Sequence, residues 1–359
     1  MKIKGNKGEW SEFYAFVKLL SIGKLYAAND KVEKIDDIFF PIIKILRNEN
    51  KKEEKEYVIS FDDGSVEIYC DIGILNKISN VDLIRISEYL YKSIVNGNSR
   101  SFEIVGSDEI MEKLHCERIS APSIEKADIK MQIHDIYTGY NPICGFSIKS
   151  EIGSPPTLLN ASKATNFIFE VKGLNDKQLN FINEINTKSK IIDRIEKILE
   201  FGKIKYKNMS NDNFYDNLLL IDTYMDSILA EILIDYYKNN IQDCKSLIER
   251  IEERNPLGYP RKGIYEYKFK KLLCSVALGM KPSIEWDGHD EANGGYIIVK
   301  EDGDVVAYHI YNRDSFEKYL LNNTKLEKGS TTKHDFAHIY YGENKNMYIN
   351  LNLQIRFIK

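Results

Sequence analysis

The sequence has few of the features that mark disulfide-rich, zinc-binding or membrane-spanning proteins. It holds five cysteines among 359 residues, an odd number with no Cys-x-x-Cys pair, so neither a disulfide framework nor a structural zinc site is indicated. The basic amino-terminal stretch has no apolar segment of the signal-peptide type, and no window of about 18 uninterrupted apolar residues occurs. We therefore expect a cytoplasmic protein with free thiols. The cysteines are Cys70, Cys116, Cys144, Cys244 and Cys274.

An excess of basic residues is also lacking. Lysine and arginine number 50 against 54 aspartates and glutamates, and the formal net charge is −4. A protein that coats nucleic acid permanently is usually basic, whereas an enzyme that binds and then releases DNA needs only a local basic surface. The charge balance thus argues against the first class and leaves the second open, and the 43% of hydrophobic residues is enough to build a sizeable core.

The order of the predicted elements divides the chain into three regions. Residues 1–175 mix helical and strand patterns, residues 176–280 are helical almost throughout, and residues 281–359 return largely to strands. We expect an α/β protein in which a mixed sheet flanked by helices is followed by a helical segment and a β-containing carboxyl-terminal region. The last region is predicted to contribute to DNA recognition.

The segments 128–135 and 145–152 have the pattern of two antiparallel strands joined by a turn-rich loop. Because side chains alternate between the faces of a strand, each segment presents one apolar and one polar face. The polar face gathers the side chains of Asp128, Gln132, Ser147, Lys149 and Glu151. Such convergent charge on one short hairpin indicates a candidate site.

These residue types suit phosphodiester hydrolysis. Carboxylates hold a hard divalent cation through oxygen, the cation polarises the phosphate and lowers the pKa of water, and a nearby ammonium offsets negative charge that grows in the transition state. Asp128 can supply the metal ligand, Lys149 the ammonium, and Glu151 a further carboxylate. The alternative is a solvated strand face with Asp–Lys ion pairs.

The hairpin resembles the PD-(D/E)xK nuclease motif, in which an Asp opens one strand and an acidic-x-Lys triplet lies on the next. Two departures stand out: Ala127 replaces the proline, and Ser147 takes the place of the second acidic residue. Ser147 is a weak metal ligand beside a carboxylate. Either Glu151 or Asp135 substitutes for the missing acid, or the cation is held there through water.

Longer strings along the whole chain resemble the HpaII family of type II restriction endonucleases. They occur in the same order from end to end and are long enough to be specific. The strings are GNKGEWSEFYAF (5–16), KADIKMQIHD (126–135), GFSIKSEIGSPPTLLNASKATNF (145–167), GGYIIVKEDGDVVAYHIYNRDSFEKYLLNNTKLEKGSTTKH (294–334) and LNLQIRF (351–357).

The resemblance implies cleavage of double-stranded DNA at CCGG with Mg²⁺, and a cognate DNA methyltransferase as the functional partner. It also implies that Asp128 and Lys149 are the motif Asp and Lys. Glu12, or else Glu9, would correspond to the acidic residue often found on the first core helix of these nucleases. A four-base palindrome suits a symmetric homodimer, and a monomer that cuts the strands in turn is equally compatible.

A polar stretch just after the second strand supplies candidate DNA contacts, namely Asn160, Ser162, Thr165 and Asn166. The alternative is that these residues cap helices and form turns, for which Asn, Ser and Thr are favoured.

Further candidates lie in the carboxyl-terminal region. Lys333 and His334 could contact phosphate or a base edge, and Arg313 and Lys325 could donate to guanine in the major groove. Two rival functions stay open at this point: a non-cleaving DNA-binding protein on a nuclease-like fold, and a nuclease that acts on RNA or without sequence preference.

Overall fold

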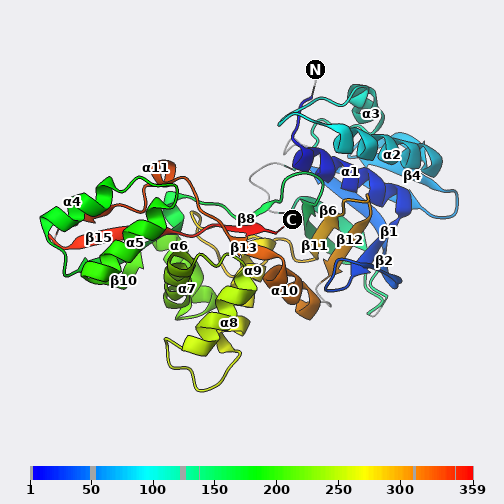
Figure 1. The fold of residues 1–359 in the computed structure, drawn as a ribbon. Helices are drawn as coiled ribbons and strands as arrows, with labels where there is room; N and C mark the ends of the chain where they lie inside the picture. The colour runs from blue at the N-terminus through cyan, green and yellow to red at the C-terminus, as the bar shows by residue number, and fades with distance from the viewer. Residues whose placement is uncertain are drawn as a thin grey trace.

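The computed structural model describes residues 3–48, 54–121, 127–136, 138–309, 313–343 and 345–358. It has two lobes, which Figure 1 shows side by side with the chain crossing between them several times. Among the described residues, no helix combines the length and the apolar character needed to cross a bilayer.

A large mixed sheet forms the first lobe. Its strands, in chain order, are β1 (Lys24–Ala28), β2 (Lys34–Asn48), β3 (Glu54–Ser60), β4 (Ser65–Cys70), β5 (Gly73–Ser79), β6 (Ile129–Ile133), β7 (Ile143–Ser150), β11 (Gly295–Val299) and β12 (Val305–His309). They lie in the order β1-β12-β11-β7-β6-β2-β3-β4-β5. The long β2 also pairs with β1, so that six of the strands form a closed ring. The β6–β7 hairpin lies within this ring.

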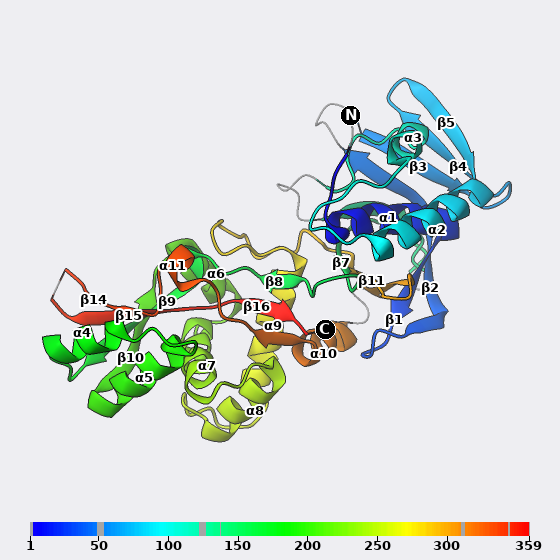
Figure 2. The same ribbon diagram turned by 45° about the horizontal axis from the view of Figure 1, so that its top comes forward.

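Three helices lie along the first lobe: α1 (Lys7–Ile22), α2 (Asn80–Asn96) and α3 (Ser107–Lys113). Helix α1 begins at a capping box, in which the Asn6 side chain accepts from the Glu9 amide and the Glu9 carboxylate accepts from the Asn6 amide. It is buried along most of its length between α2 and the sheet, and Figure 2 shows the two helices running across the strands. Any polar residue of α1 that faces the sheet is therefore held rigidly.

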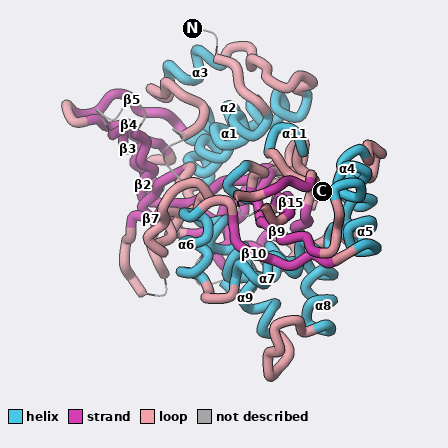
Figure 3. Tube along the Cα trace, turned by 90° about the vertical axis from the view of Figure 1, so that its left-hand side faces the viewer, coloured by secondary structure: helices cyan, strands magenta, loops and turns pink. Residues whose placement is uncertain are grey.

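The second lobe combines a small sheet with most of the helices (Figure 3). The sheet has the strand order β10-β9-β15-β14, with β9 at Asn166–Lys172, β10 at Lys203–Met209, β14 at Ile339–Tyr341 and β15 at Met347–Asn352. Its helices are α4 (Asp176–Glu184), α5 (Lys190–Phe201), α6 (Asp212–Ile221), α7 (Met225–Asn239), α8 (Cys244–Arg254), α9 (Ile264–Leu278), α10 (Arg313–Asn322) and α11 (Thr331–His334).

A third sheet of three short strands lies between the lobes (Figure 1). It contains β8 (Thr157–Leu159), β13 (Thr324–Leu326) and β16 (Ile355–Phe357), in the order β13-β16-β8. A 3₁₀ turn at Lys163–Thr165 leads from β8 into the second lobe. Because β8 follows β7 directly along the chain, this sheet places one wall of the second lobe beside the β6–β7 hairpin.

The structure corrects the expected division into three consecutive regions. The segment 281–359 is not a separate unit: β11 and β12 complete the large sheet, β14 and β15 extend the small one, and β13 and β16 pair with β8 or with each other. The region 176–280, expected to be helical, contains the strand β10. These pairings join residues far apart in the sequence, which local periodicity does not encode.

Candidate active site

The β6–β7 hairpin is formed as its alternating pattern predicts. The two strands are antiparallel with Ile129 opposite Phe146, and the predicted apolar face is buried, with Ile129, Met131 and Ile133 of β6 and Phe146 and Ile148 of β7. Asp128 stands immediately before β6, where its amide donates to the Phe146 carbonyl at 2.9 Å. This bond continues the ladder by one residue and fixes the side chain of Asp128 beside the middle of β7.

The Asp128 carboxylate is held by groups of the neighbouring strand. Its Oδ2 accepts from the Ile148 amide at 2.6 Å and from the Ser147 hydroxyl at 3.1 Å. The Lys149 ammonium lies 3.9 Å from the same oxygen and donates to the Ile148 carbonyl at 3.2 Å. The predicted Asp and Lys thus meet on one side of the hairpin, and Ser147 positions the carboxylate by hydrogen bonding.

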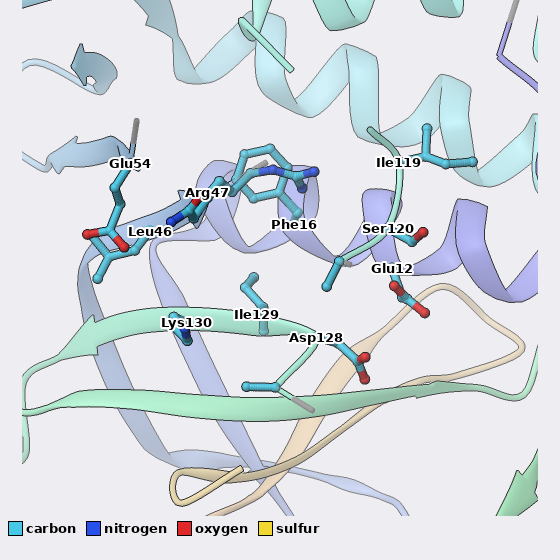
Figure 4. A pocket seen from close by; sticks show the side chains of 13 residues that line it. Glu12, Phe16, Leu46, Arg47, Glu54, Ile119, Ser120, Asp128, Ile129 and Lys130 are labelled. Atoms are coloured by element: carbon cyan, nitrogen blue, oxygen red, sulfur yellow. The ribbon is translucent and has the colours of Figure 1, made fainter. Parts of the chain in front are cut away.

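A second carboxylate reaches the same place from α1. Figure 4 shows the Glu12 side chain extending from the helix toward the side of the pocket where Asp128 lies. Burial and, to a smaller extent, the Asp128 charge raise the pKa of Glu12 to about 8, against the opposing effect of Lys149. The site therefore brings together two carboxylates and one ammonium group. This balance of charge favours the binding of either a proton or an added cation.

The other acids proposed to compensate for Ser147 lie elsewhere. Strand β7 ends at Ser150, and Glu151 lines a cavity with Lys149, Glu301 and Tyr319 that Asp128 does not line. Asp135 lies past the opposite end of β6, roughly 20 Å along an extended chain from Asp128, and accepts from the Thr138 hydroxyl at 2.7 Å. The structure therefore corrects both expectations: among the described residues, Glu12 lines a pocket with Asp128 and interacts with its charge, whereas Glu151 and Asp135 line no cavity with Asp128.

The donor set can be tested for its fit to a divalent cation. Among the described residues, no cluster of three or more His, Cys, Asp or Glu side chains is arranged to hold a metal. The carboxylates of Asp128 and Glu12, however, are hard oxygen donors, and the Asp128 charge raises the pKa of Glu12 more than the Lys149 charge lowers it. Mg²⁺ keeps several waters and is commonly bound through one or two carboxylates, so these two residues fit the ion.

Open space surrounds this site on two sides. A cavity of about 420 Å³ is lined by Asp128, Lys149, Asn160 and Ser162 and by the end of α9. A larger cavity of about 920 Å³ lies on the other side and is lined by Glu12 and Lys149 together with basic residues. The basic residues are Lys7, Arg100 and Arg356. Asp128, Glu12 and Lys149 therefore border open space that could accommodate a long polyanion.

The polar stretch after β7 divides into two groups. Asn160 and Ser162 line the cavity beside Asp128. Thr165 and Asn166, by contrast, are 0% and 2% exposed, and both accept hydrogen bonds from the Asn352 side chain. The structure thus replaces the expected DNA contact of Thr165 and Asn166 with an internal role, which agrees with the capping chemistry favoured by these residue types.

The remaining predicted DNA contacts are spread over the second lobe. Arg313 begins α10, where it pairs with Glu317 at 3.4 Å, and Lys325 lies in β13. Lys333 and His334 form the end of the short helix α11, with Lys333 exposed. None of these residues lines either of the two cavities that contain Lys149 and adjoin the carboxylates.

One wall of the smaller cavity was not anticipated from the sequence. It is formed by Val276 and Ala277 of α9 and by the following loop, Gly279–Ser283. From the sequence, this segment belongs to the predicted helical region or directly follows it. Lys281, which comes after Gly279 and Met280, matches no known motif. Only the folded chain shows that it faces Asp128.

A pair of carboxylates, a lysine and a bordering open cavity are the components of a metal-dependent phosphodiesterase site. A sequence profile described as HpaII restriction endonuclease matches residues 6–357. The chain is also 42% identical over 362 aligned residues to the type II restriction enzyme HpaII of Haemophilus parainfluenzae, covering 99% of this chain and 98% of that protein. No solved structure shows a significant match. The chain belongs to the HpaII restriction endonuclease family.

Replacing Ser147 with alanine tests the positioning role of its hydroxyl. One hydrogen bond to the Asp128 carboxylate is lost, and a bond to a charged group contributes about 1.5 kcal/mol. We expect the single-turnover rate of DNA cleavage to fall by about tenfold, far less than for removal of Asp128 or Lys149. A loss as large as that of the Asp128 variant would contradict a supporting role.

The raised pKa of Glu12 predicts how stability depends on pH when divalent metal is absent. Between its ordinary value of 4.5 and about 8, Glu12 keeps a proton in the folded protein that the unfolded chain has lost. The free energy of unfolding due to this group therefore falls as pH rises through that window. Urea unfolding in EDTA at several pH values should show this decline, and Glu12→Gln should reduce it. Identical pH profiles for the two proteins would refute the assignment.

Proposed function

We propose that this protein hydrolyses phosphodiester bonds of double-stranded DNA at CCGG in a reaction that requires Mg²⁺. The observation that carries the proposal is the meeting of Asp128, Glu12 and Lys149 at one point beside open space. The family membership supports DNA as the substrate, and the resemblance of the sequence supports CCGG as the site. The nuclease-like α/β core is proposed to be of the PD-(D/E)xK type.

In the proposed mechanism, Asp128 and Glu12 would hold a Mg²⁺ ion, and such an ion would supply polarisation of the phosphate and a lowered pKa of water. Ser147 and the Ile148 amide fix the orientation of the Asp128 carboxylate. Lys149 orients the attacking water and offsets charge on the pentacovalent transition state. Water attacks phosphorus, the bond to the 3′ oxygen breaks, and the products are a 5′-phosphate and a 3′-hydroxyl.

The biological setting follows from this activity. An enzyme that cuts CCGG in the cytoplasm requires a cognate methyltransferase that protects the DNA of its own cell. The palindromic site also suits a symmetric homodimer, with one active site for each strand.

Digestion of defined DNA tests the proposed function directly. Purified protein with Mg²⁺ should produce a fixed set of fragments from DNA that contains CCGG and should leave matched DNA without CCGG intact. End mapping of the fragments should find 5′-phosphates within the site. A smear, loss of RNA, or fragments that end at another sequence would contradict the proposed specificity.

One observation favours a second candidate, a DNA-binding protein that does not cleave. Ser147 occupies the position of an acidic residue in the motif, and the described residues contain no cluster of three or more potential metal ligands. Such a protein would retard DNA that contains CCGG without cutting it at any Mg²⁺ concentration. The digestion experiment therefore separates the two candidates.

A further inference from the structure

The loop after α9 faces the active site across the smaller cavity. Lys281 and Ser283 of this loop line the same cavity of about 420 Å³ as Asp128 and Lys149. Lys281 is half-buried and Ser283 is exposed. Among the described residues that line the cavity, the charged ones are Asp128, Lys149 and Lys281. The two lysines outnumber the acid, so this wall has a net positive charge even without a divalent cation.

A buried asparagine holds this loop in place. Asn217 of α6 is 1% exposed, and its side-chain amide donates to the carbonyls of Lys281 at 3.1 Å and Ile284 at 2.8 Å. Its carbonyl oxygen accepts from the Trp286 amide at 2.9 Å. Both N–H groups and the carbonyl oxygen of the Asn217 side chain thus bond to the backbone of residues 281–286, which fixes the backbone position of Lys281.

The other polar residues of the cavity come from the opposite side. Asn160 and Ser162 follow β8 and line the cavity together with Lys281. Their short side chains can donate hydrogen bonds to phosphate oxygens, as lysine can. The cavity is therefore lined by Lys281 on a fixed loop, by the neutral donors Asn160 and Ser162, and by Asp128 and Lys149 of the proposed reaction centre.

We propose that Lys281 binds a backbone phosphate of the DNA next to the scissile one and so positions the duplex from the side of the second lobe. This inference rests on the proposed function, because it takes the polyanion in the cavity to be duplex DNA. The two lysines on the wall would contact successive phosphates, with Lys149 at the bond that is cut. Lys281 is then a positioning residue, since the reacting atoms lie at Asp128 and Lys149.

A phosphate contact has a signature that separates it from a base contact. Each lysine that neutralises one phosphate contributes about 0.9 to the slope of log Kd against log salt concentration. Its loss weakens binding to every sequence by the same factor, whereas loss of a base contact weakens binding to the cognate site only. We expect Lys281→Ala to behave in the first way.

The test measures DNA binding without cleavage. Full-length protein in EDTA is titrated into labelled duplexes with and without CCGG at several salt concentrations, and fluorescence anisotropy gives Kd. For Lys281→Ala we expect both duplexes to bind about five- to tenfold more weakly at low salt, with a salt slope lower by about one. Lys281→Arg should retain most of the wild-type affinity. Lys245→Ala, which removes the same charge from an exposed position on α8, should match the wild type.

Specific results would overturn the inference. A salt slope for Lys281→Ala equal to that of Lys245→Ala would exclude a phosphate contact, and a loss confined to the CCGG duplex would indicate a base contact instead. The wild-type digestion assay reports separately on the proposed function. Protein that binds DNA with the expected dependence on Lys281 but never cuts would sustain the inference and refute the hydrolysis.

Discussion

We expect Lys149→Ala to lower the single-turnover rate of DNA cleavage by about 10²–10³-fold, the cost of removing one charge-stabilising group from a transition state. Lys149 lies 3.9 Å from Asp128, and it lines both cavities beside the site. Without it, negative charge on the transition state loses the ammonium that is paired with Asp128. Quenched digestion with excess enzyme over a CCGG duplex measures this rate.

The fold should survive the same substitution. The Lys149 side chain is 30% exposed, and an ion pair of this kind contributes at most about 1 kcal/mol to stability. The Asp128 carboxylate keeps its bonds to Ser147 and the Ile148 amide. Lys172→Ala, which removes an exposed lysine of the second lobe, is the matched control. Cutting by Lys149→Ala at the wild-type rate would refute the proposed catalytic role.

The second large effect is expected for Glu12→Gln. The neutral amide keeps the size of the side chain but removes the charge that would hold a divalent cation beside Asp128, so cleavage should fall by about 10²–10³-fold. Part of this loss should be recovered at high Mg²⁺ concentration, because the amide oxygen is a weaker ligand but still a ligand. Initial rates over a range of Mg²⁺ concentrations give both quantities.

Glu151→Gln is the control that distinguishes Glu12 from Glu151 as the residue that supplies the second carboxylate. Glu151 lines a cavity with Lys149, Glu301 and Tyr319 that Asp128 does not line, so the variant should cut at close to the wild-type rate with an unchanged Mg²⁺ dependence. If Glu151→Gln lost activity while Glu12→Gln kept it, Glu151 would be the second acid, as strand alternation predicted, and the assignment of Glu12 would be wrong.

The sequence predicts the centre of the site because the information there is local. Alternation within residues 128–135 and 145–152 is enough to place Asp128 and Lys149 on one side of a hairpin, and the structure has them there. The same rule fails for Glu151, since it assumes that the strand stays regular past Ser150, where β7 ends. Alternation gives no support to Asp135, which has the parity of the buried face of β6 and lies beyond the far end of that strand.

Long-range pairings lie outside the reach of periodicity. No local pattern shows that Glu12, more than a hundred residues before Asp128, would be brought to it by α1, and only the resemblance of the first helix to that of related nucleases suggested it. Thr165 and Asn166 have the composition of a surface loop, yet Asn352 of β15 covers both. The Lys281 loop faces the site because Asn217 and the end of α9 place it there.

The central claim is that Asp128 and Glu12 share one divalent cation beside Lys149. Titration of the wild type, Asp128→Asn, Glu12→Gln and Glu151→Gln with Mn²⁺, followed through the electron paramagnetic resonance signal of the free ion, tests this most directly. We expect the wild type and Glu151→Gln to bind Mn²⁺ with the same affinity, and Asp128→Asn and Glu12→Gln to bind it at least about tenfold more weakly. Unchanged Mn²⁺ affinity in Glu12→Gln, together with loss in Glu151→Gln, would contradict the account.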